Sequence, residues 1–246
     1  KAKTLEGSEI ALSEKTIESL KKSLQGPTIF PGEDGYDQSR RVWNAMIDRK
    51  PAAIVRCLGI SDVIASVQFA RENDILLSIK GGGHNIAGLA VADGALMLDM
   101  SPMRGVWVDP QKKIAHAQAG SLLGDVDRET QVHGLAAVLG FVSQTGIAGL
   151  TLGGGIGYLT RRWGWTVDNV VGMDIVTAES KLVHASNDEN EDLFWGLRGG
   201  GGNAEAGQVD VGVPPDRPEG VGALVHEVRD RSPGRRVTVL HPVRSP

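Results

Sequence analysis

Glycine is concentrated in three short clusters, and these clusters constrain the fold of this chain more than any other feature. The 246 residues include 33 glycines, which gather at residues 81–83, 153–157 and 199–202. Neighbouring glycines permit backbone conformations and close approaches that other residues do not. The clusters therefore indicate specific turns and backbone contacts rather than general flexibility.

The first cluster lies in the run Lys80-Gly81-Gly82-Gly83-His84-Asn85, which directly follows a predicted strand at residues 75–79. The backbone N–H groups of such a loop can approach an anion closely. The loop is not a P-loop, because no Gly-Lys-Ser/Thr follows at the required spacing, and its glycines are wrongly spaced for a Rossmann fingerprint. An ordinary tight turn and a phosphate-binding loop are equally compatible with these residues taken alone.

A second glycine-rich run extends from Gly146 through Gly149, Gly153 and Gly154 to Gly157. It can be interpreted as a glycine-rich helix that packs closely on a sheet. It can also be interpreted as a second backbone surface for the same ligand, with N–H groups facing pyrophosphate oxygens. Two such loops on one chain suit a dinucleotide better than a single phosphate.

The periodicity of the apolar residues predicts an α+β fold rather than a strict βαβ series. An irregular linker is expected over residues 27–51. The predicted strands cover residues 53–58, 75–79, 95–99, 106–109 and 113–118, followed by a hairpin of 170–177 and 181–184. Helices are predicted over 13–25 with Ser13 as N-cap, from Ser61 as N-cap, from Ser121 to about Gly134, and over 192–198.

Composition excludes several classes of function. The formal net charge is −4, from 26 Lys+Arg against 30 Asp+Glu, so neither a nucleic-acid footprint nor a polybasic membrane patch is indicated. No apolar stretch is long enough to span a membrane, and no signal peptide is visible. The single cysteine, Cys57, rules out an internal disulfide, and we expect a cytoplasmic protein. His116, His133, His184, His226 and His241 are interpreted as structural or solvated.

The composition changes after Asn203. Residues 204–246 hold six of the eleven prolines and contain no Phe, Tyr, Trp, Ile or Lys. A segment with so little to bury is expected to have weak or no order, although residues 237–240 could add a strand. We therefore divide the chain into an N-terminal helix and linker (1–50), a central domain (51–203) and an atypical Pro/Arg-rich tail (204–246). The tail is interpreted as a truncated or frame-shifted end, or as a genuine short variant that pairs with a partner.

The two glycine-rich runs, together with the segment from Gly164 through Asp168-Asn169-Val170, resemble the FAD-binding domain of berberine bridge enzyme-like oxidases. These proteins belong to the vanillyl-alcohol oxidase/p-cresol methylhydroxylase superfamily, and the resemblance is to the 6-hydroxy-D-nicotine oxidase-like branch. It runs from about residue 51 to 203, with motifs in matching order and spacing. It implies the p-cresol methylhydroxylase type of fold, in which two α+β subdomains hold the flavin between them. The family's substrate domain is expected to be absent.

The resemblance also implies roles for individual residues. His84 matches the histidine bonded to the 8α-methyl carbon of FAD. Val142 stands where some members carry a second flavin-linking cysteine, so that only single attachment is expected. The cofactor-binding residues implied in this way are Lys80, Gly81, Gly82, Gly83, His84, Asn85, Val142, Thr145, Gly146, Gly149, Gly153, Gly154, Gly157, Asn169 and Val170.

The implied activity is that of an FAD-dependent oxidase. Hydride would pass from a C–H bond of a small-molecule substrate to the flavin, and O2 would reoxidise it and give H2O2. The catalytic base, the substrate and the oligomeric state are not identified by these residues. Three alternatives stay open: a degenerate flavin-binding module, a dehydrogenase with dissociable FAD, and a glycine-rich α+β domain without a cofactor.

Overall fold

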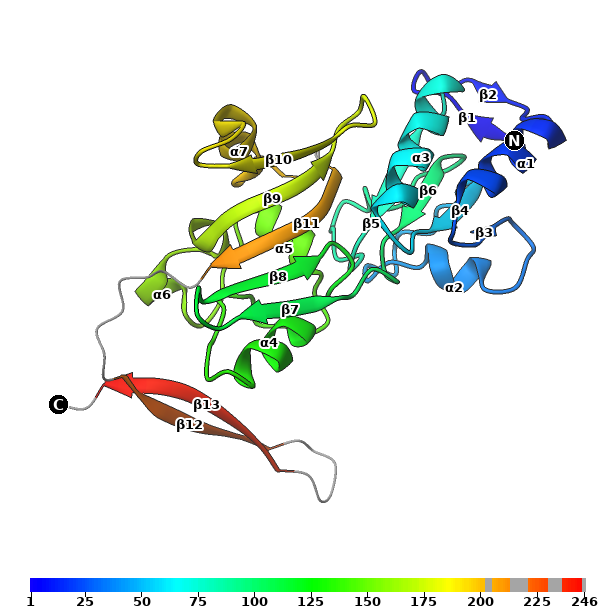
Figure 1. Ribbon diagram of the computed structural model, residues 1–246. Helices are drawn as coiled ribbons and strands as arrows, with labels where there is room; N and C mark the ends of the chain where they lie inside the picture. The colour runs from blue at the N-terminus through cyan, green and yellow to red at the C-terminus, as the bar shows by residue number, and fades with distance from the viewer. Residues whose placement is uncertain (202–204, 213–220, 230–235, 245–246) are drawn as a thin grey trace. The chain divides into compact units, whose positions relative to one another are not determined.

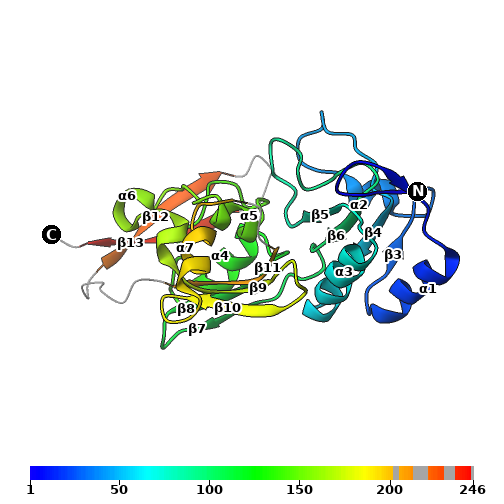
Figure 2. The same cartoon turned by 90° about the horizontal axis from the view of Figure 1, so that it is seen from above.

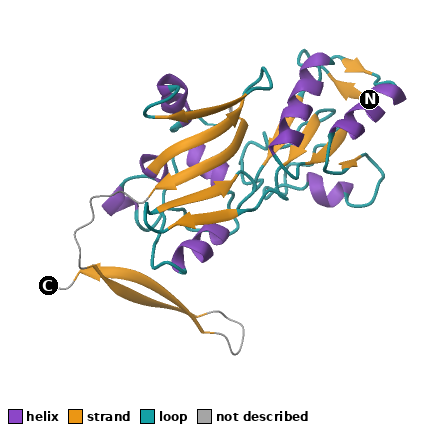
Figure 3. Ribbon diagram, in the orientation of Figure 1, coloured by secondary structure: helices purple, strands orange, loops and turns teal. Residues whose placement is uncertain are grey.

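The computed structural model describes the backbone of residues 1–201, 205–212, 221–229 and 236–244, and the side chains of residues 1–201. The chain divides into two compact units, Lys1–Val213 and Pro214–Pro246. Helices and strands alternate irregularly along the first unit, which confirms the predicted α+β class (Figure 1 and Figure 3).

A four-stranded sheet organises the N-terminal part of the first unit. Its strand order is β3 (Thr28–Ile29), β4 (Ala53–Arg56), β6 (Leu96–Asp99), β5 (Leu77–Lys80). β4 and β5 both pair with β6 in parallel, whereas β3 adds to β4 in the antiparallel sense. All four residues of β6 are buried, as expected for the central strand of a mostly parallel sheet covered on both faces.

Two helices pack beside this sheet. α1 (Glu14–Ser23) contacts α3 (Ile60–Glu72), and the two lie side by side in Figure 2. The carboxylate of Asp62 is fully buried and accepts backbone N–H bonds from Gln25 (2.8 Å), Gly26 (3.1 Å) and Leu58 (2.8 Å). Because a buried charge is costly unless such bonds satisfy it, Asp62 ties the chain before β3 to α3.

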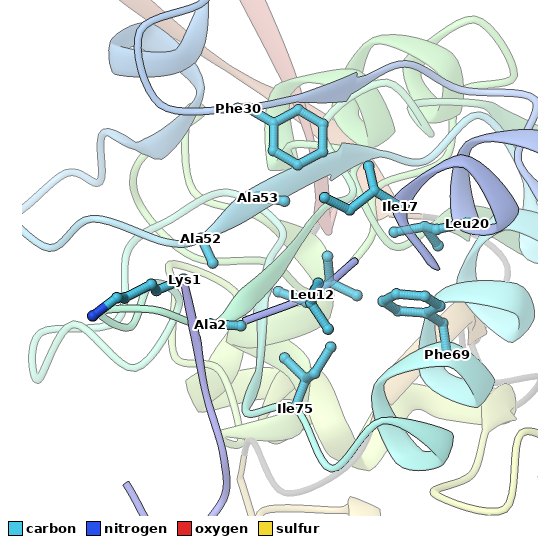
Figure 4. Close-up of a pocket in the computed structure, with 11 residues that line it drawn as sticks. Lys1, Ala2, Leu12, Ile17, Leu20, Phe30, Ala52, Ala53, Phe69 and Ile75 are labelled. Carbon is cyan, nitrogen blue, oxygen red and sulfur yellow. The ribbon is translucent and has the colours of Figure 1, made fainter. Parts of the chain in front are cut away.

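A small apolar cavity of about 100 Å³ remains between these helices and the sheet (Figure 4). Ile17 and Leu20 of α1 and Phe69 of α3 line it, and Lys1 supplies the only charged side chain among the residues drawn. A cavity without convergent polar groups is a packing gap in the core and offers no chemistry.

The C-terminal part of the first unit is a five-stranded antiparallel sheet. Its order is β10 (Leu182–Ser186), β9 (Val170–Val176), β11 (Glu205–Gly212), β8 (Ile114–Gln118), β7 (Val106–Asp109). Met173 and Ile175 of β9 and Ala115 and Ala117 of β8 are buried in the main hydrophobic core. The helical elements of this part are α4 (Leu123–Gln131), α5 (Ile147–Leu152), α6 (Thr160–Trp163), η1 (Thr166–Asn169) and α7 (Glu191–Leu197).

The second unit consists of the antiparallel pair β12 (Val221–Arg229) and β13 (Arg236–Arg244), and β13 contains the strand expected at residues 237–240. β11 extends the five-stranded sheet of the first unit, and the weak order that composition predicts after residue 203 stays a prediction. Composition indicates how much apolar surface a segment can bury, but it does not predict backbone hydrogen bonds such as those that pair β11 with β8 and β9.

Two local predictions need correction. Ser13 does cap α1, accepting a 3.1 Å bond from the Thr16 N–H, but Ser61 lies inside α3, whose N-cap is Gly59. The expected linker over residues 27–51 contains β3, the short antiparallel partner of β4, and α2 (Tyr36–Arg40). Tyr36 is buried and donates a 2.6 Å hydrogen bond to the Pro51 carbonyl, so the apparent linker has a packed anchor. None of the helices in the described part of the chain is long and apolar enough to cross a membrane.

Candidate functional site: a cavity between two glycine loops

A cavity of about 490 Å³ lies where the four-stranded sheet meets the helices of the five-stranded sheet. This volume falls within the roughly 300–1,000 Å³ that small-molecule sites occupy. One wall is β5 with the first glycine loop (residues 80–85), and the other is α5 with the start of the second glycine segment (residues 146–157). Eight of the predicted cofactor-binding residues line it: Gly81, Gly82, Gly83, His84, Asn85, Gly146, Gly149 and Gly153.

The two glycine runs meet backbone to backbone at Gly82 and Gly146. A Cβ on Gly82 would lie 2.6 Å from the Gly146 Cα, and a Cβ on Gly146 would lie 2.9 Å from the Gly82 Cα. No side chain other than hydrogen fits at either position. Residues 64 positions apart in the sequence are thereby joined into one continuous surface, which the separate motifs did not reveal.

His84 stands at the cavity wall directly after Gly83, whose φ of 71° is in the left-handed region. The imidazole is partly buried and stacks on the indole of Trp43, with ring centroids 5.6 Å apart and planes inclined by 20°. Within the described part of the chain, no hydrogen bond or ion pair engages the His84 ring, so both ring nitrogens keep their chemistry available.

Lys80 is the first-loop residue that does not line the cavity. Its ammonium group is buried, bonds to the Ser39 carbonyl and lies 3.7 Å from the carboxylate of Asp99. Burial lowers the pKa of Lys80, and the neighbouring Asp99 carboxylate opposes that shift. Lys80 therefore anchors the base of the loop against residues before β4.

The second glycine segment divides into two parts. Gly149 lies within α5 and Gly153 caps it, and a Cβ on Gly149 would meet nothing within 4 Å. By contrast, Gly154 packs against the Trp165 ring, and a Cβ on Gly157 would overlap the carbonyl oxygen of Leu139. The first part faces the cavity, and the second part packs against protein.

Four further predicted residues lie away from the cavity walls. Val142 is 48% exposed, and the Thr145 carbonyl accepts a 2.9 Å bond from the Leu123 N–H. Asn169 is buried and donates to the carbonyls of Trp163 (3.0 Å) and Trp165 (2.8 Å), while Val170 begins β9. The cofactor-binding roles predicted for these residues, for Lys80, Gly154 and Gly157, and for the eight residues that line the cavity all stay predictions.

Sequence reasoning missed the rest of the lining, most of which is apolar. The apolar run that predicted β5 could have indicated some of these lining residues, because the residues at the end of a strand lie next to the loop that follows it. The Ser78 hydroxyl of β5 is buried without a hydrogen-bond partner among the described residues. The lining residues that were not predicted are Leu77, Ser78, Ile79, Leu89, Ala90, Met100, Ala119, Ala148, Leu150, Leu152 and Gly201.

These walls fit FAD. The missing side chain of Gly149 leaves space at the cavity wall, and the contact of Gly82 with Gly146 places main-chain groups there that an anion can approach. The apolar lining residues offer contact to flat rings. Among the described residues no group of three or more His, Cys, Asp or Glu side chains could hold a metal ion.

This architecture, with two α+β parts enclosing a glycine-walled cavity, defines a flavin-binding module. The family model described as "FAD binding domain" matches residues 51–186. The chain belongs to this family, within the berberine bridge enzyme-like FAD-linked oxidoreductases, and FAD is the family's cofactor.

Relatives of known identity agree. The chain is 38% identical over 181 residues to (R)-6-hydroxynicotine oxidase of Paenarthrobacter nicotinovorans, covering 74% of this chain and 40% of that protein. The crystal structure of 6-hydroxy-D-nicotine oxidase from Arthrobacter nicotinovorans superposes with a TM-score of 0.78 at 34% identity, covering 87% of this chain and 46% of the other.

A second solved relative is the glucooligosaccharide oxidase from Acremonium strictum, described as carrying a 6-S-cysteinyl, 8α-N1-histidyl FAD. Its TM-score is 0.76 at 33% identity, over 80% of this chain and 42% of that one. The chain thus spans less than half the length of the relatives it matches, and the similarity concerns their FAD-binding region.

Proposed function

We propose that this chain is the FAD-binding part of an oxidase that holds its flavin covalently through His84. The observation that carries the proposal is the position of the His84 ring on the wall of the glycine-lined cavity, with neither nitrogen engaged by the described residues. The histidyl flavin of the related glucooligosaccharide oxidase supports it.

Imidazole suits this task because its neutral form is a good nucleophile near physiological pH. In the attachment, an imidazole N–H and one C–H of the flavin 8-methyl group are replaced by a C–N bond. Two electrons and two protons leave in the net change, and O2 accepts them as H2O2. Val142 occupies the position of the family's second, cysteinyl link, which supports attachment at one point only.

The bound flavin would supply hydride acceptance from a substrate C–H bond and reoxidation by O2. The chain's own residues would do the holding: Gly82 and Gly146 present backbone to the pyrophosphate, and Gly149 leaves room beside α5. A small-molecule substrate, O2 as oxidant and turnover by the whole protein belong to the proposal. We also propose a cytoplasmic location, which the single cysteine of the chain, Cys57, fits because it leaves no internal disulfide.

Acid precipitation of the purified protein tests the tether. We expect the wild-type pellet to retain yellow, fluorescent flavin, and His84→Ala to release all of its flavin into the supernatant. His133→Ala is the matched control, because His133 is exposed near the end of α4 and does not line the cavity. Flavin that stays with the denatured His84→Ala protein would contradict the assignment of His84.

The same experiment separates the alternative of dissociable FAD. A wild-type protein that is yellow when folded but releases its flavin on denaturation would support a non-covalent dehydrogenase or a flavin-binding module. A protein purified without flavin that binds none when FAD is added would contradict both forms of the proposal.

A further inference from the structure

Residues 39–49, here called the strap, clamp the loop that carries His84. The strap precedes β4 and lies against residues 80–91. Three of its contacts are hydrogen bonds to loop carbonyls: the Trp43 N–H to Gly83 (2.9 Å), the Asn44 amide to Ile86 (3.0 Å) and the Arg49 guanidinium to Gly88 (2.9 Å). From the loop side, the buried Lys80 ammonium bonds to the Ser39 carbonyl.

Packing adds to these bonds. A Cβ on Gly88 would lie 2.7 Å from the Ile47 side chain, and one on Gly83 would lie 3.6 Å from the Val42 Cα. Val42 and Ile47 also pack against a buried cluster that includes Ile54 and Met97. The strap is thus attached to the sheet on one side and to the His84 loop on the other.

Trp43 differs from its neighbours in the strap. Its side chain is 64% exposed, so core burial does not explain an indole at this position. The ring contact that the structure gives it is the stack on the His84 imidazole. An exposed indole that stacks on one imidazole restricts the side-chain rotamers that this histidine can adopt.

We infer that Trp43 is a positioning residue for flavin attachment: it fixes the plane of the His84 imidazole and leaves the other face and the ring nitrogens to the cavity. This inference rests on the proposed covalent tether. A nucleophile held in one orientation reacts faster than one that samples several, and a small loss of alignment slows the bond-forming step. We expect loss of the indole to slow attachment about three- to tenfold without weakening FAD binding.

The chain contains a matched second stack. Trp107 of β7 lies on His116 of β8 with centroids 5.0 Å apart and planes inclined by 12°, and neither residue lines the cavity. Trp107→Ala therefore removes the same kind of ring pair from the other sheet. It controls for general effects of losing an exposed tryptophan.

The rate experiment uses the 246-residue chain purified without flavin and then mixed with FAD. Samples are acid-precipitated over time, and the flavin in the pellet is measured. Trp43→Ala is expected to attach flavin three- to tenfold more slowly than wild type, Trp43→Phe to recover most of the rate, and Trp107→Ala to match wild type. Equal rates in Trp43→Ala and wild type would overturn the inference.

Binding is measured separately in the His84→Ala background, where the proposed attachment cannot occur. The dissociation constant for FAD should change less than twofold when Trp43→Ala is added. A large loss of affinity would show that Trp43 contacts the cofactor or supports the fold, and the positioning role would be wrong. A wild-type protein that attaches no flavin would instead contradict the tether proposed for His84.

Proton NMR of the flavin-free protein gives a readout that does not depend on attachment. The face of an indole shields protons above it, so the His84 ring protons should move downfield in Trp43→Ala and stay in place in Trp107→Ala. The His116 protons should show the converse. Unchanged His84 signals in Trp43→Ala would overturn the stacked arrangement.

Discussion

The first glycine loop and the second glycine segment look alike in sequence but use glycine differently. In the first loop, Gly81, Gly82 and Gly83 all line the cavity. In the second segment, Gly146, Gly149 and Gly153 line it, whereas Gly154 and Gly157 pack against Trp165 and Leu139. Lining the cavity and permitting close backbone contact are therefore two separate uses of glycine. Gly149 serves the first, Gly157 serves the second, and Gly82 and Gly146 serve both.

The largest effect is expected at the point where the two runs touch. In Gly82→Ala the new methyl group would overlap the Gly146 backbone, and neither main chain can move aside without disturbing its wall of the cavity. We expect a loss of about 3 kcal/mol or more of unfolding free energy in urea, together with loss of flavin.

Two matched variants sharpen that result. Gly157→Ala should cost similar stability, because its methyl group would overlap the Leu139 carbonyl, although Gly157 does not line the cavity. Gly196→Ala in α7, where a Cβ would meet nothing within 4 Å, should be neutral or slightly stabilising. A Gly82→Ala protein as stable as wild type would contradict the described contact.

Gly149→Ala separates ligand space from stability. Alanine in the interior of α5 meets no protein atom, so the unfolding free energy should stay equal or rise by about 0.5–1 kcal/mol. The added methyl group enters the cavity, and we expect FAD to bind about tenfold more weakly, or about 1.4 kcal/mol, in the His84→Ala background. Gly196→Ala is the control, because it makes the same change in a helix away from the cavity; equal FAD affinity in both variants would refute the open role of Gly149.

A smaller effect, which depends on pH, is expected for α4, the helix next to the second glycine segment. The N-terminus of α4 holds the residues that lead into this segment: the Leu123 N–H donates to the Thr145 carbonyl and the Gly124 N–H donates to the Ser143 carbonyl. Within α4, burial raises the pKa of Asp127 to about 6. In the unfolded chain the Asp127 carboxyl has the ordinary pKa of about 3.9, so the folded state binds this proton more tightly than the unfolded state does. The free energy of unfolding should therefore fall as pH rises from about 4 to 6.

Asp127→Asn should therefore stabilise the protein at pH 7 by about 1–3 kcal/mol and flatten the dependence between pH 4 and 6. Urea titrations at pH 5 and pH 7 measure both effects. Asp188→Asn, at an exposed position between β10 and α7, should change stability by less than about 0.5 kcal/mol. An unchanged pH profile in Asp127→Asn would show that this carboxyl group titrates normally.

The parts of the fold that sequence could predict are those that local pattern specifies. Alternating or continuous apolar runs located β4 to β9 to within a few residues, and Ser13 predicted the start of α1. β3 was missed because two residues carry no periodicity, and β11 was missed because its stability comes from pairing with β8 and β9 rather than from its own side chains.

For the site too, sequence predicted the residues that form local motifs and missed those brought together by the fold. The glycine runs and His84 were visible as motifs, and eight residues from them line the cavity. The contact of Gly82 with Gly146, the apolar walls and the stack of Trp43 on His84 depend on segments brought together by the two sheets. No local signal in a single sequence records such encounters.

The buried carboxylate of Asp62 determines how much of the chain must be kept together when this flavin-binding domain is expressed alone or fused to another protein. The family match begins at residue 51, yet two of the three N–H groups that satisfy Asp62 come from Gln25 and Gly26. β3 and the strap also precede that boundary. A gene fragment that starts at residue 51 would encode every glycine of both cavity walls. It would, however, remove two of the three N–H donors to the buried Asp62 carboxylate, the strand that pairs with the outer edge of β4, and the strap that bonds to the His84 loop. The unit that can be transferred is therefore larger than the region that the family model matches, and fusions or transplants of this flavin site should include the first fifty residues.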